Sequence, residues 1–334
     1  MNHKEQEARE LVIRAGQLLL KQGLVARTWG NISARVSSTH FVITPSGRSY
    51  ETLHPEDLVL VRIDDQAYEG TIKPSSEKGI HAAAYLHRPD AGVVIHTHQT
   101  YASCVSVDGQ DLTDLNNELL GDFVPCAAYG LPGTKTLLRH VDAVMVRYPT
   151  SNAILLHRHG ALCMARDFDR AFEILQALED TSRTVFERTV TYSGIVAKDP
   201  ENLLDSLRCA EPNKYFTIES HSAVLDITRH NRTLIPCLDD LAQIAGATIR
   251  CAAPNPDAIL KALNRRNAVL VKGVGAICCA EDEDDLAAIT AIIRKGCMAA
   301  RYCTAHRAAP LSSLDRHLMR TVYTTKYSKR KSEA

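Results

Sequence analysis

The feature that most constrains the fold is a segment that occurs twice. Residues 152–167 read NAILLHRHGALCMARD and residues 267–281 read NAVLVKGVGAICCAE, and without gaps Gly160 aligns with Gly275. Each copy is an apolar run, a short turn and a second apolar run, followed by a long Ala- and Leu-rich helical pattern. Such a repeat predicts two related α/β units in one chain.

The two copies differ at the histidines that could bind a metal. The second copy has Val274 where the first has His159, and we find no counterpart in it of the segment His96-Thr97-His98 or of the strands that precede that segment. Upstream, FVPC (123–126) aligns with LIPC (234–237). We therefore expect a metal site in the first copy and a degenerate, metal-free second copy.

The expected domain boundaries follow from how regular the hydrophobic periodicity is along the 334 residues. We expect a catalytic α/β domain at 1–192 and a linker at 193–213, where the periodicity weakens and prolines occur. A degenerate half domain at 214–318 and a basic tail at 319–334 complete the chain.

Composition excludes several classes of partner. Lys plus Arg and Asp plus Glu both number 39, so the formal net charge is zero and no global field favours nucleic acid or a membrane surface. The sequence shows no signal-peptide pattern and no apolar run long enough to span a bilayer. We expect a cytoplasmic protein whose ten cysteines are reduced.

A pair of histidines closes the apolar run GVVIHTH (92–98). Because side chains alternate along a strand, His96 and His98 share one face and form a ready pair of ligands for a metal such as Zn²⁺. His159 stands out as the third ligand because Gly160 follows it and permits a close approach. His157 lies on the same face, and spacing does not separate the two. The other histidines considered were His81, His87 and His140.

The segment KPSSE (73–77) has the character of an anion site. Ser75 and Ser76 precede a predicted helix, and hydroxyl groups together with helix-terminal amides bind anions. Glu77 stands in the first turn of that helix, where it could equally be only a favourable first-turn carboxylate.

Seven motifs in order, TWGNIS, ITPSG, PEDLV, KPSSE, HxxxY with RPD, VVIHTH and HGAL, resemble the class II aldolase/adducin family over residues 5–190. The resemblance implies a three-layer αβα domain around a mainly antiparallel sheet. It also implies a divalent ion, Zn²⁺ or alternatively Mn²⁺ or Co²⁺, held by His96, His98 and His159, which favours His159 over His157.

The resemblance further implies roles for other residues. Glu77 would be the catalytic acid/base, and Tyr129 would protonate the departing aldehyde from a neighbouring subunit, so that the protein would be a homo-oligomer, a tetramer or a dimer. The substrate's phosphate would be bound by Gly30, Asn31, Ser46, Gly47, Ser75 and Ser76.

These residues predict a metal-dependent carbon–carbon lyase that cleaves a ketose phosphate into dihydroxyacetone phosphate and an aldehyde. Family epimerases carry Asp at the position of Glu77, which favours cleavage here. The alternatives are decarboxylation of a hydroxy acid, which passes through a similar enolate, and a non-catalytic, adducin-like structural role. The intact histidine triad weighs against the structural role, because a scaffold does not need it.

Overall fold

The computed structural model describes residues 3–22, 24–25, 29–198, 200 and 202–327. Its contacts divide the chain into unit 1, Met1–Val185, and unit 2, Phe186–Ala334. The division falls within one long helix, a few residues before the end predicted for the catalytic domain. Each unit has its own sheet.

Unit 1 is built on a seven-stranded sheet with the order β3-β2-β1-β4-β7-β6-β5. Within the described residues, β5 and β6 form the one parallel pair of this sheet, and the other neighbours are antiparallel. The strands are β1 Asn31–Arg35, β2 His40–Ile43, β3 Val59–Arg62, β4 Val93–Thr97, β5 Cys126–Ala127, β6 Ala153–Leu156 and β7 Gly160–Ala165.

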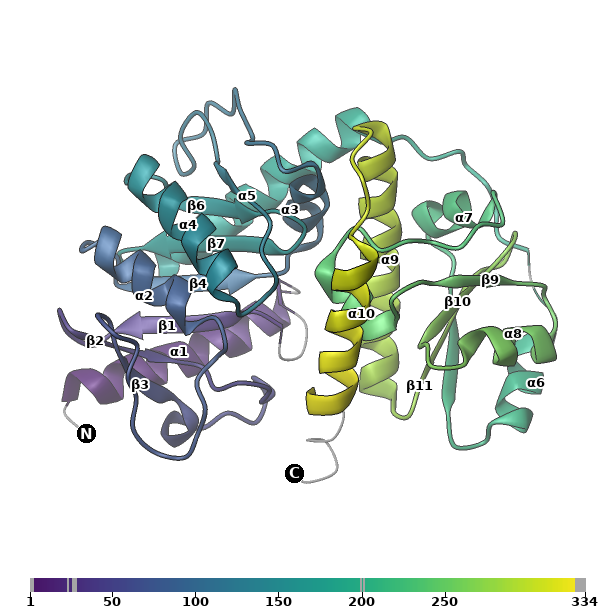
Figure 1. Cartoon of the computed structure of the whole chain (residues 1–334), viewed down its shortest axis with the longest axis horizontal. Helices are drawn as coiled ribbons and strands as arrows, with labels where there is room; N and C mark the ends of the chain where they lie inside the picture. Colours follow the sequence, from purple (N-terminus) through teal and green to yellow (C-terminus); the bar gives the residue numbers. More distant parts are fainter. Residues whose placement is uncertain (1–2, 23, 26–28, 199, 201, 328–334) are drawn as a thin grey trace. The chain divides into compact units, whose positions relative to one another are not determined.

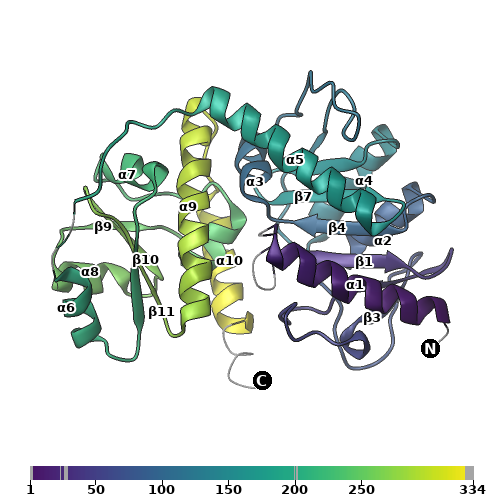
Figure 2. The same cartoon turned by 180° about the vertical axis from the view of Figure 1, so that it is seen from behind.

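Helices cover both faces of this sheet, so unit 1 has three layers. In Figure 1 the helices α2 and α4 lie in front of the sheet, and the reverse view in Figure 2 brings α1 and α5 to the front. The helices are α1 His3–Lys21, α2 Lys78–His87, α3 Thr100–Val105, α4 Lys135–Arg147 and α5 Phe168–Thr189, with the 3₁₀ turns η1 Pro55–Asp57 and η2 Ser106–Asp108. The predicted α/β fold with a mainly antiparallel sheet is confirmed.

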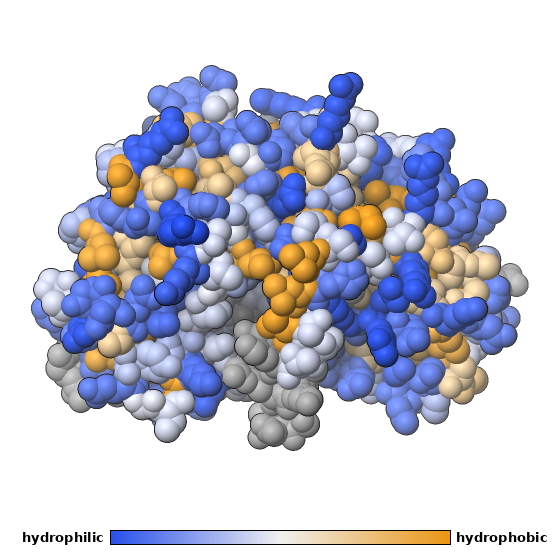
Figure 3. Space-filling model, in the orientation of Figure 1, coloured by the Kyte–Doolittle hydropathy of each residue, from blue (hydrophilic) through white to orange (hydrophobic). Residues whose placement is uncertain are grey.

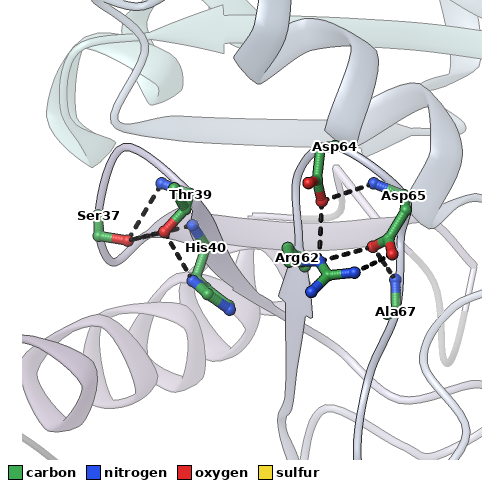
Figure 4. Close-up of polar contacts among 7 residues, drawn as sticks. All are labelled: Ser37, Thr39, His40, Arg62, Asp64, Asp65 and Ala67. Carbon is green, nitrogen blue, oxygen red and sulfur yellow. Dashed lines mark hydrogen bonds and ion pairs between the residues drawn. The ribbon is translucent and has the colours of Figure 1, made fainter.

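The sequence explains why the central strands lie where they do. β4 and β7 are buried along their whole length, as expected for apolar runs covered on both faces. At the edge of the sheet the turns are polar (Figure 4). Ser37 Oγ accepts hydrogen bonds from the backbone N–H groups of Thr39 and His40, and Arg62 pairs with acidic residues just after β3.

Unit 2 contains a four-stranded sheet with the order β8-β11-β10-β9. Its strands are β8 Tyr215–Glu219, β9 Arg250–Ala252, β10 Ala268–Val271 and β11 Gly275–Ala280. Its helices are α6 Leu203–Ala210, α7 Ser222–Thr228, α8 Pro256–Leu263, α9 Glu283–Ala305 and α10 Ser313–Val322, with the π-helical segments η3 Leu241–Ala245 and η4 Tyr323–Tyr327.

The four strands repeat the pairing of β4, β7, β6 and β5. In the β6–β7 pair Ala153 lies opposite Cys163 and Leu156 opposite Gly160, and in the β10–β11 pair the aligned residues Ala268 with Cys278 and Val271 with Gly275 do the same. β9 runs parallel to β10 as β5 does to β6, and β8 is antiparallel to β11 as β4 is to β7.

The helices follow the same order around the strands. The sequence α6-β8-α7-β9-α8-β10-β11-α9 in unit 2 matches α2-β4-α3-β5-α4-β6-β7-α5 in unit 1. Strands corresponding to β1, β2 and β3 do not occur among the described residues of unit 2. The internal repeat is therefore a repeat of topology and strand register as well as of sequence.

The structure corrects the predicted extent of the repeat. The HTH segment does have a counterpart, because Ile218 in β8 pairs opposite Ile277 as His96 in β4 pairs opposite Leu162. The counterpart escaped sequence comparison because neither histidine survives: Ile218 and Ser220 take the two places. The repeat thus includes more than the back half of unit 1.

Two further predictions about this region were wrong. The equivalent of β5 is β9, so CAA (126–128) corresponds to CAA (251–253), not to the segment ending at Cys237. The stretch predicted as a linker contains α6, whose Leu203 and Leu207 are buried in the core of unit 2. With only two buried leucines in two turns, α6 gives a weak periodic signal.

The predicted basic tail is partly helical. Residues 319–327 continue α10 and form η4, and residues 328–334 lie outside the described residues. Arg320 donates to the carbonyl oxygens of Gln243 and Ile244, and so holds this part of the chain to the end of η3.

Hydrophilic side chains cover most of the face seen in Figure 3. Among the helices that the structure describes, none combines the length and the apolar character needed to cross a membrane.

Candidate metal centre and substrate site

The central strands of unit 1 bring three histidines together. His96 lies in β4, His98 follows the end of that strand, and His159 immediately precedes β7. Because β4 and β7 are antiparallel neighbours, the end of β4 lies beside the beginning of β7. A Cβ on Gly160 would lie 2.2 Å from the carbonyl oxygen of Thr97, so only glycine permits this approach.

The imidazole nitrogens of the triad converge on one point. Nε2 of His96 lies 3.0 Å from Nε2 of His98 and 3.0 Å from Nε2 of His159. His96 Nδ1 lies 2.9 Å from the carbonyl oxygen of Ala161 and donates to it, which leaves the lone pair of Nε2 directed at the other rings. Nitrogen ligands about 2.0–2.1 Å from a tetrahedral Zn²⁺ are themselves about 3.3 Å apart, so the triad fits a divalent ion of this kind.

The burial of this centre favours the metal-binding form of His96. His96 and His159 are buried and His98 is half-buried. Desolvation lowers the pKa of His96 well below its usual value, so the neutral, metal-binding form is favoured. A divalent cation at this point would be bound by the ring nitrogens of the three histidines.

Glu77 completes the centre. It immediately precedes α2, and its carboxylate oxygens lie 3.4 Å from His96 Nε2 and 3.3 Å from His159 Nε2. Burial opposes ionisation of this carboxyl group, and a divalent ion held by the triad would favour its ionised form.

The remaining histidines considered as ligands lie elsewhere. The ring of His157 contacts the carbonyl oxygen of Val107 at 3.3 Å, and His87 and His140 contact Asp142 and the carbonyl oxygen of Ala128. The geometry therefore gathers His159, and not His157, with the pair on β4.

The turns predicted to bind an anion meet beside the triad. Ser46 N donates to the carbonyl oxygen of Lys73, and Ser75 N donates to that of Thr44, which joins the PSG turn containing Gly47 to the PSSE segment. Gly30 has a φ of +96°, and a Cβ there would lie 2.5 Å from the carbonyl oxygen of His96. Asn31 follows Gly30 and donates from Nδ2 to Glu77 Oε2 at 3.0 Å.

Tyr129 and Ser76 lie at the periphery. The ring of Tyr129 is 6.0 Å from that of His157 and 5.9 Å from the guanidinium of Arg158, beside the turn that holds His159. Ser76 is exposed, which leaves its hydroxyl accessible to a ligand. Its side chain lies near Gly133, where a Cβ would be 3.1 Å from Ser76 Oγ.

Sequence reasoning missed one part of the site. Asn31 Oδ1 lies 2.5 Å from His81 Nε2, and Ser33 Oγ lies 2.7 Å from His81 Nδ1 and 2.8 Å from the hydroxyl of Tyr85. His81 had been considered only as a metal ligand. The signal was the HxxxY spacing itself, which places both side chains on one face of α2, opposite Ser33 of the TWGNIS motif.

The comparisons with known proteins agree with this geometry. Residues 10–186 match the family described as Class II Aldolase and Adducin N-terminal domain. The 5-deoxy-D-ribulose 1-phosphate aldolase of Bacillus thuringiensis is 32% identical over 185 residues, which are 54% of this chain and 85% of the relative. The L-ribulose-5-phosphate 4-epimerase UlaF of Salmonella paratyphi B is 30% identical over 193 residues, 53% of this chain and 83% of the relative.

A solved structure of an L-fuculose 1-phosphate aldolase superposes with a TM-score of 0.52 at 28% identity, covering 61% of this chain and 96% of that protein. The matched region contains the histidine triad and Glu77. The chain therefore belongs to the class II aldolase and adducin N-terminal domain family, and it carries that family's histidine metal site in unit 1.

Proposed function

We propose that this protein is a divalent-metal-dependent aldolase that cleaves a ketose phosphate into dihydroxyacetone phosphate and an aldehyde. The observation that carries the proposal is the position of the Glu77 carboxylate, within 3.4 Å of the Nε2 atoms of His96 and His159 and held by Asn31. An acid/base group there can reach the carbon next to a carbonyl group bound at the same centre.

His96, His98 and His159 would hold the ion, Zn²⁺ or alternatively Mn²⁺ or Co²⁺. When bound, it supplies a Lewis acid that polarises the substrate's carbonyl group. In the cleavage direction a proton leaves the hydroxyl group of the aldehyde-forming carbon, the adjacent carbon–carbon bond breaks, and the carbon that keeps the electron pair is protonated. We assign the proton transfer at this carbon to Glu77, whose carboxylate would remove the proton in the condensation direction and, once protonated, return it in the cleavage direction.

The anion-binding turns would fix the substrate's phosphate. Gly30 and Asn31, Ser46 and Gly47, and Ser75 and Ser76 lie in turns next to each other, and the serine hydroxyls can donate to a phosphate. Two relatives act on phosphorylated pentuloses, by their names, which supports a sugar phosphate as the ligand.

Two related reactions define the alternatives. The relatives include both aldolases and epimerases, by their names. The family resemblance implies Asp in epimerases where this chain has Glu77, and this supports cleavage. Decarboxylation of a hydroxy acid would use the same acid/base position, with the turns binding a carboxylate. A non-catalytic adducin-like role gives no reason for the histidine triad and the buried Glu77.

We also propose a cytoplasmic homo-oligomer, a dimer or tetramer, in which Tyr129 of one subunit accepts the proton that leaves the hydroxyl group of the aldehyde-forming carbon in the site of another and returns it to the aldehyde oxygen in the condensation direction. Tyr129 lies at the rim of the site, beside the turn that holds His159. All ten cysteines are free thiols, which suits a reducing compartment.

A substrate screen tests the proposed reaction. The protein is stripped with a chelator, divalent ions are added back singly, and ketose phosphates and hydroxy acids are compared by product analysis. We expect metal-dependent release of dihydroxyacetone phosphate from a ketose phosphate. Inversion of a hydroxyl without cleavage would replace the proposal with epimerisation, and release of CO₂ would replace it with decarboxylation.

A further inference from the structure

A line of hydrogen bonds runs from Tyr85 on α2 to Glu77. The hydroxyl of Tyr85 contacts Ser33 Oγ at 2.8 Å, and Ser33 Oγ contacts His81 Nδ1 at 2.7 Å. His81 Nε2 contacts Asn31 Oδ1 at 2.5 Å, and Asn31 Nδ2 contacts Glu77 Oε2 at 3.0 Å. All five side chains are buried, so these contacts are not exchanged for water.

The chemistry of the groups fixes the direction of every bond in the line. Asn31 directs its Nδ2 at Glu77 Oε2 and its Oδ1 at His81 Nε2, so its amide donates to the carboxyl group and its oxygen faces the imidazole. That oxygen can only accept, so the proton of His81 is on Nε2 and the lone pair is on Nδ1. Ser33 must then donate to His81, and Tyr85 must donate to Ser33.

Burial keeps His81 and Tyr85 in the protonation states that these bonds require. Burial lowers the pKa of His81 to about 3, so the ring is neutral at ordinary pH. Burial raises the pKa of Tyr85, so its hydroxyl keeps the proton that it donates.

Resting on the proposed function, we propose that His81 is a positioning residue for Glu77. Held as the Nε2–H tautomer by Ser33 and Tyr85, it sets the orientation of the Asn31 amide so that this amide donates to the catalytic carboxylate. Without His81, the amide is free to turn its oxygen toward Glu77, where two acceptors repel each other and the carboxylate moves from its place beside the triad.

Kinetics of two variants test this role. His81→Leu keeps the volume and removes both ring nitrogens, whereas His81→Gln keeps an N–H donor within reach of Asn31. Loss of such a supporting hydrogen bond typically costs about 10- to 100-fold. We expect His81→Leu to lower kcat by that factor with KM and metal content retained, and His81→Gln to restore most of the loss.

A control separates positioning from lost stability. Leu137 lies on α4 in the same hydrophobic core as Tyr85, outside the hydrogen-bonded line, and Leu137→Ala destabilises that core. We expect its kcat, measured below its own unfolding temperature, to stay close to that of the wild type. Equal losses of kcat in Leu137→Ala and His81→Leu, or no difference between His81→Leu and His81→Gln, would overturn the proposal.

The tautomer provides a test that needs no substrate. In the full-length protein labelled with ¹⁵N-histidine, two-bond ¹H–¹⁵N spectra distinguish the two tautomers, and the His81 signals are those missing from His81→Gln. We expect protonation on Nε2. Protonation on Nδ1 would overturn the proposed direction of the line even if the enzyme cleaves ketose phosphates. Nε2 protonation with no turnover of any sugar phosphate would instead refute the proposed function and leave the orientation of Asn31 standing.

Discussion

Gly275 offers a test of the repeat at a position far along the sequence from the proposed metal ligands and catalytic residues. It begins β11 with a φ of +133°, and a Cβ added to it would lie 2.4 Å from the carbonyl oxygen of Glu219. Its equivalent in unit 1, Gly160, would place a Cβ 2.2 Å from the carbonyl oxygen of Thr97. Glu219 and Thr97 occupy matching places on β8 and β4, so the glycine permits the same close approach in both units.

The cost of Gly275→Ala can be worked out from two contributions. A left-handed φ costs a residue with a side chain about 1–2 kcal/mol. Forcing a methyl group against a backbone that cannot retreat costs about 1–3 kcal/mol more. We therefore expect Gly275→Ala to lower the free energy of unfolding of unit 2 by about 2–5 kcal/mol.

Gly194→Ala is the matched control. Gly194 also has a positive φ, +67°, but a Cβ there meets nothing within 4 Å, so only the conformational term of about 1–2 kcal/mol applies. Urea unfolding followed by hydrogen exchange of peptides from 268–280 measures the effect on unit 2 separately from unit 1. If Gly275→Ala destabilises unit 2 no more than Gly194→Ala does, the close approach of β8 and β11 is not what retains the glycine.

Three further predictions concern unit 1. Glu77→Gln should retain the metal and lower turnover by about 10²–10⁴-fold in steady-state assays, and near-normal turnover would make Glu77 only a helix-start carboxylate. Replacing Ser75 and Ser76 by Ala should raise KM for a phosphorylated substrate with little change in the unfolding midpoint; an unchanged KM would refute their role in phosphate binding. The pKa of His81 is about 3 in the fold and 6.5 in the reference state, so the unfolded chain binds a proton more readily between these values. Stability should therefore fall as pH drops through this range, by up to about 1.4 kcal/mol per pH unit, and less steeply in His81→Gln; parallel profiles from urea unfolding would contradict the pKa of His81.

Sequence patterns predicted the architecture of unit 1 well because its strands are strongly apolar. The apolar run Ala153–Leu156 forms β6, and β4, Val93–Thr97, lies within the apolar run 92–98. Histidines at the end of such a run are conspicuous, which is why the triad could be predicted from short motifs. The Glu77 position was equally visible because a serine pair and a helix start surround it.

Other features left no pattern in the sequence. β8 corresponds to β4, but with Ile218 and Ser220 in place of two histidines, only its pairing with β11 reveals the correspondence. The Ser33–His81–Asn31 contacts join residues about 50 positions apart, and hydrogen-bond partners at that separation are set by the packing of α2 on the sheet. Strand register and tertiary contacts, rather than local preference, decide such features.

The metal content of the purified protein tests whether the three histidines of unit 1 bind a divalent ion. We predict about one divalent ion per chain by elemental analysis, since the three Nε2 atoms of unit 1 form a single centre. In His159→Ala we predict that this content falls together with activity, while His157→Ala keeps both. A wild-type protein that takes up no divalent ion, or full occupancy in His159→Ala, would contradict the assignment of His96, His98 and His159 as the metal ligands.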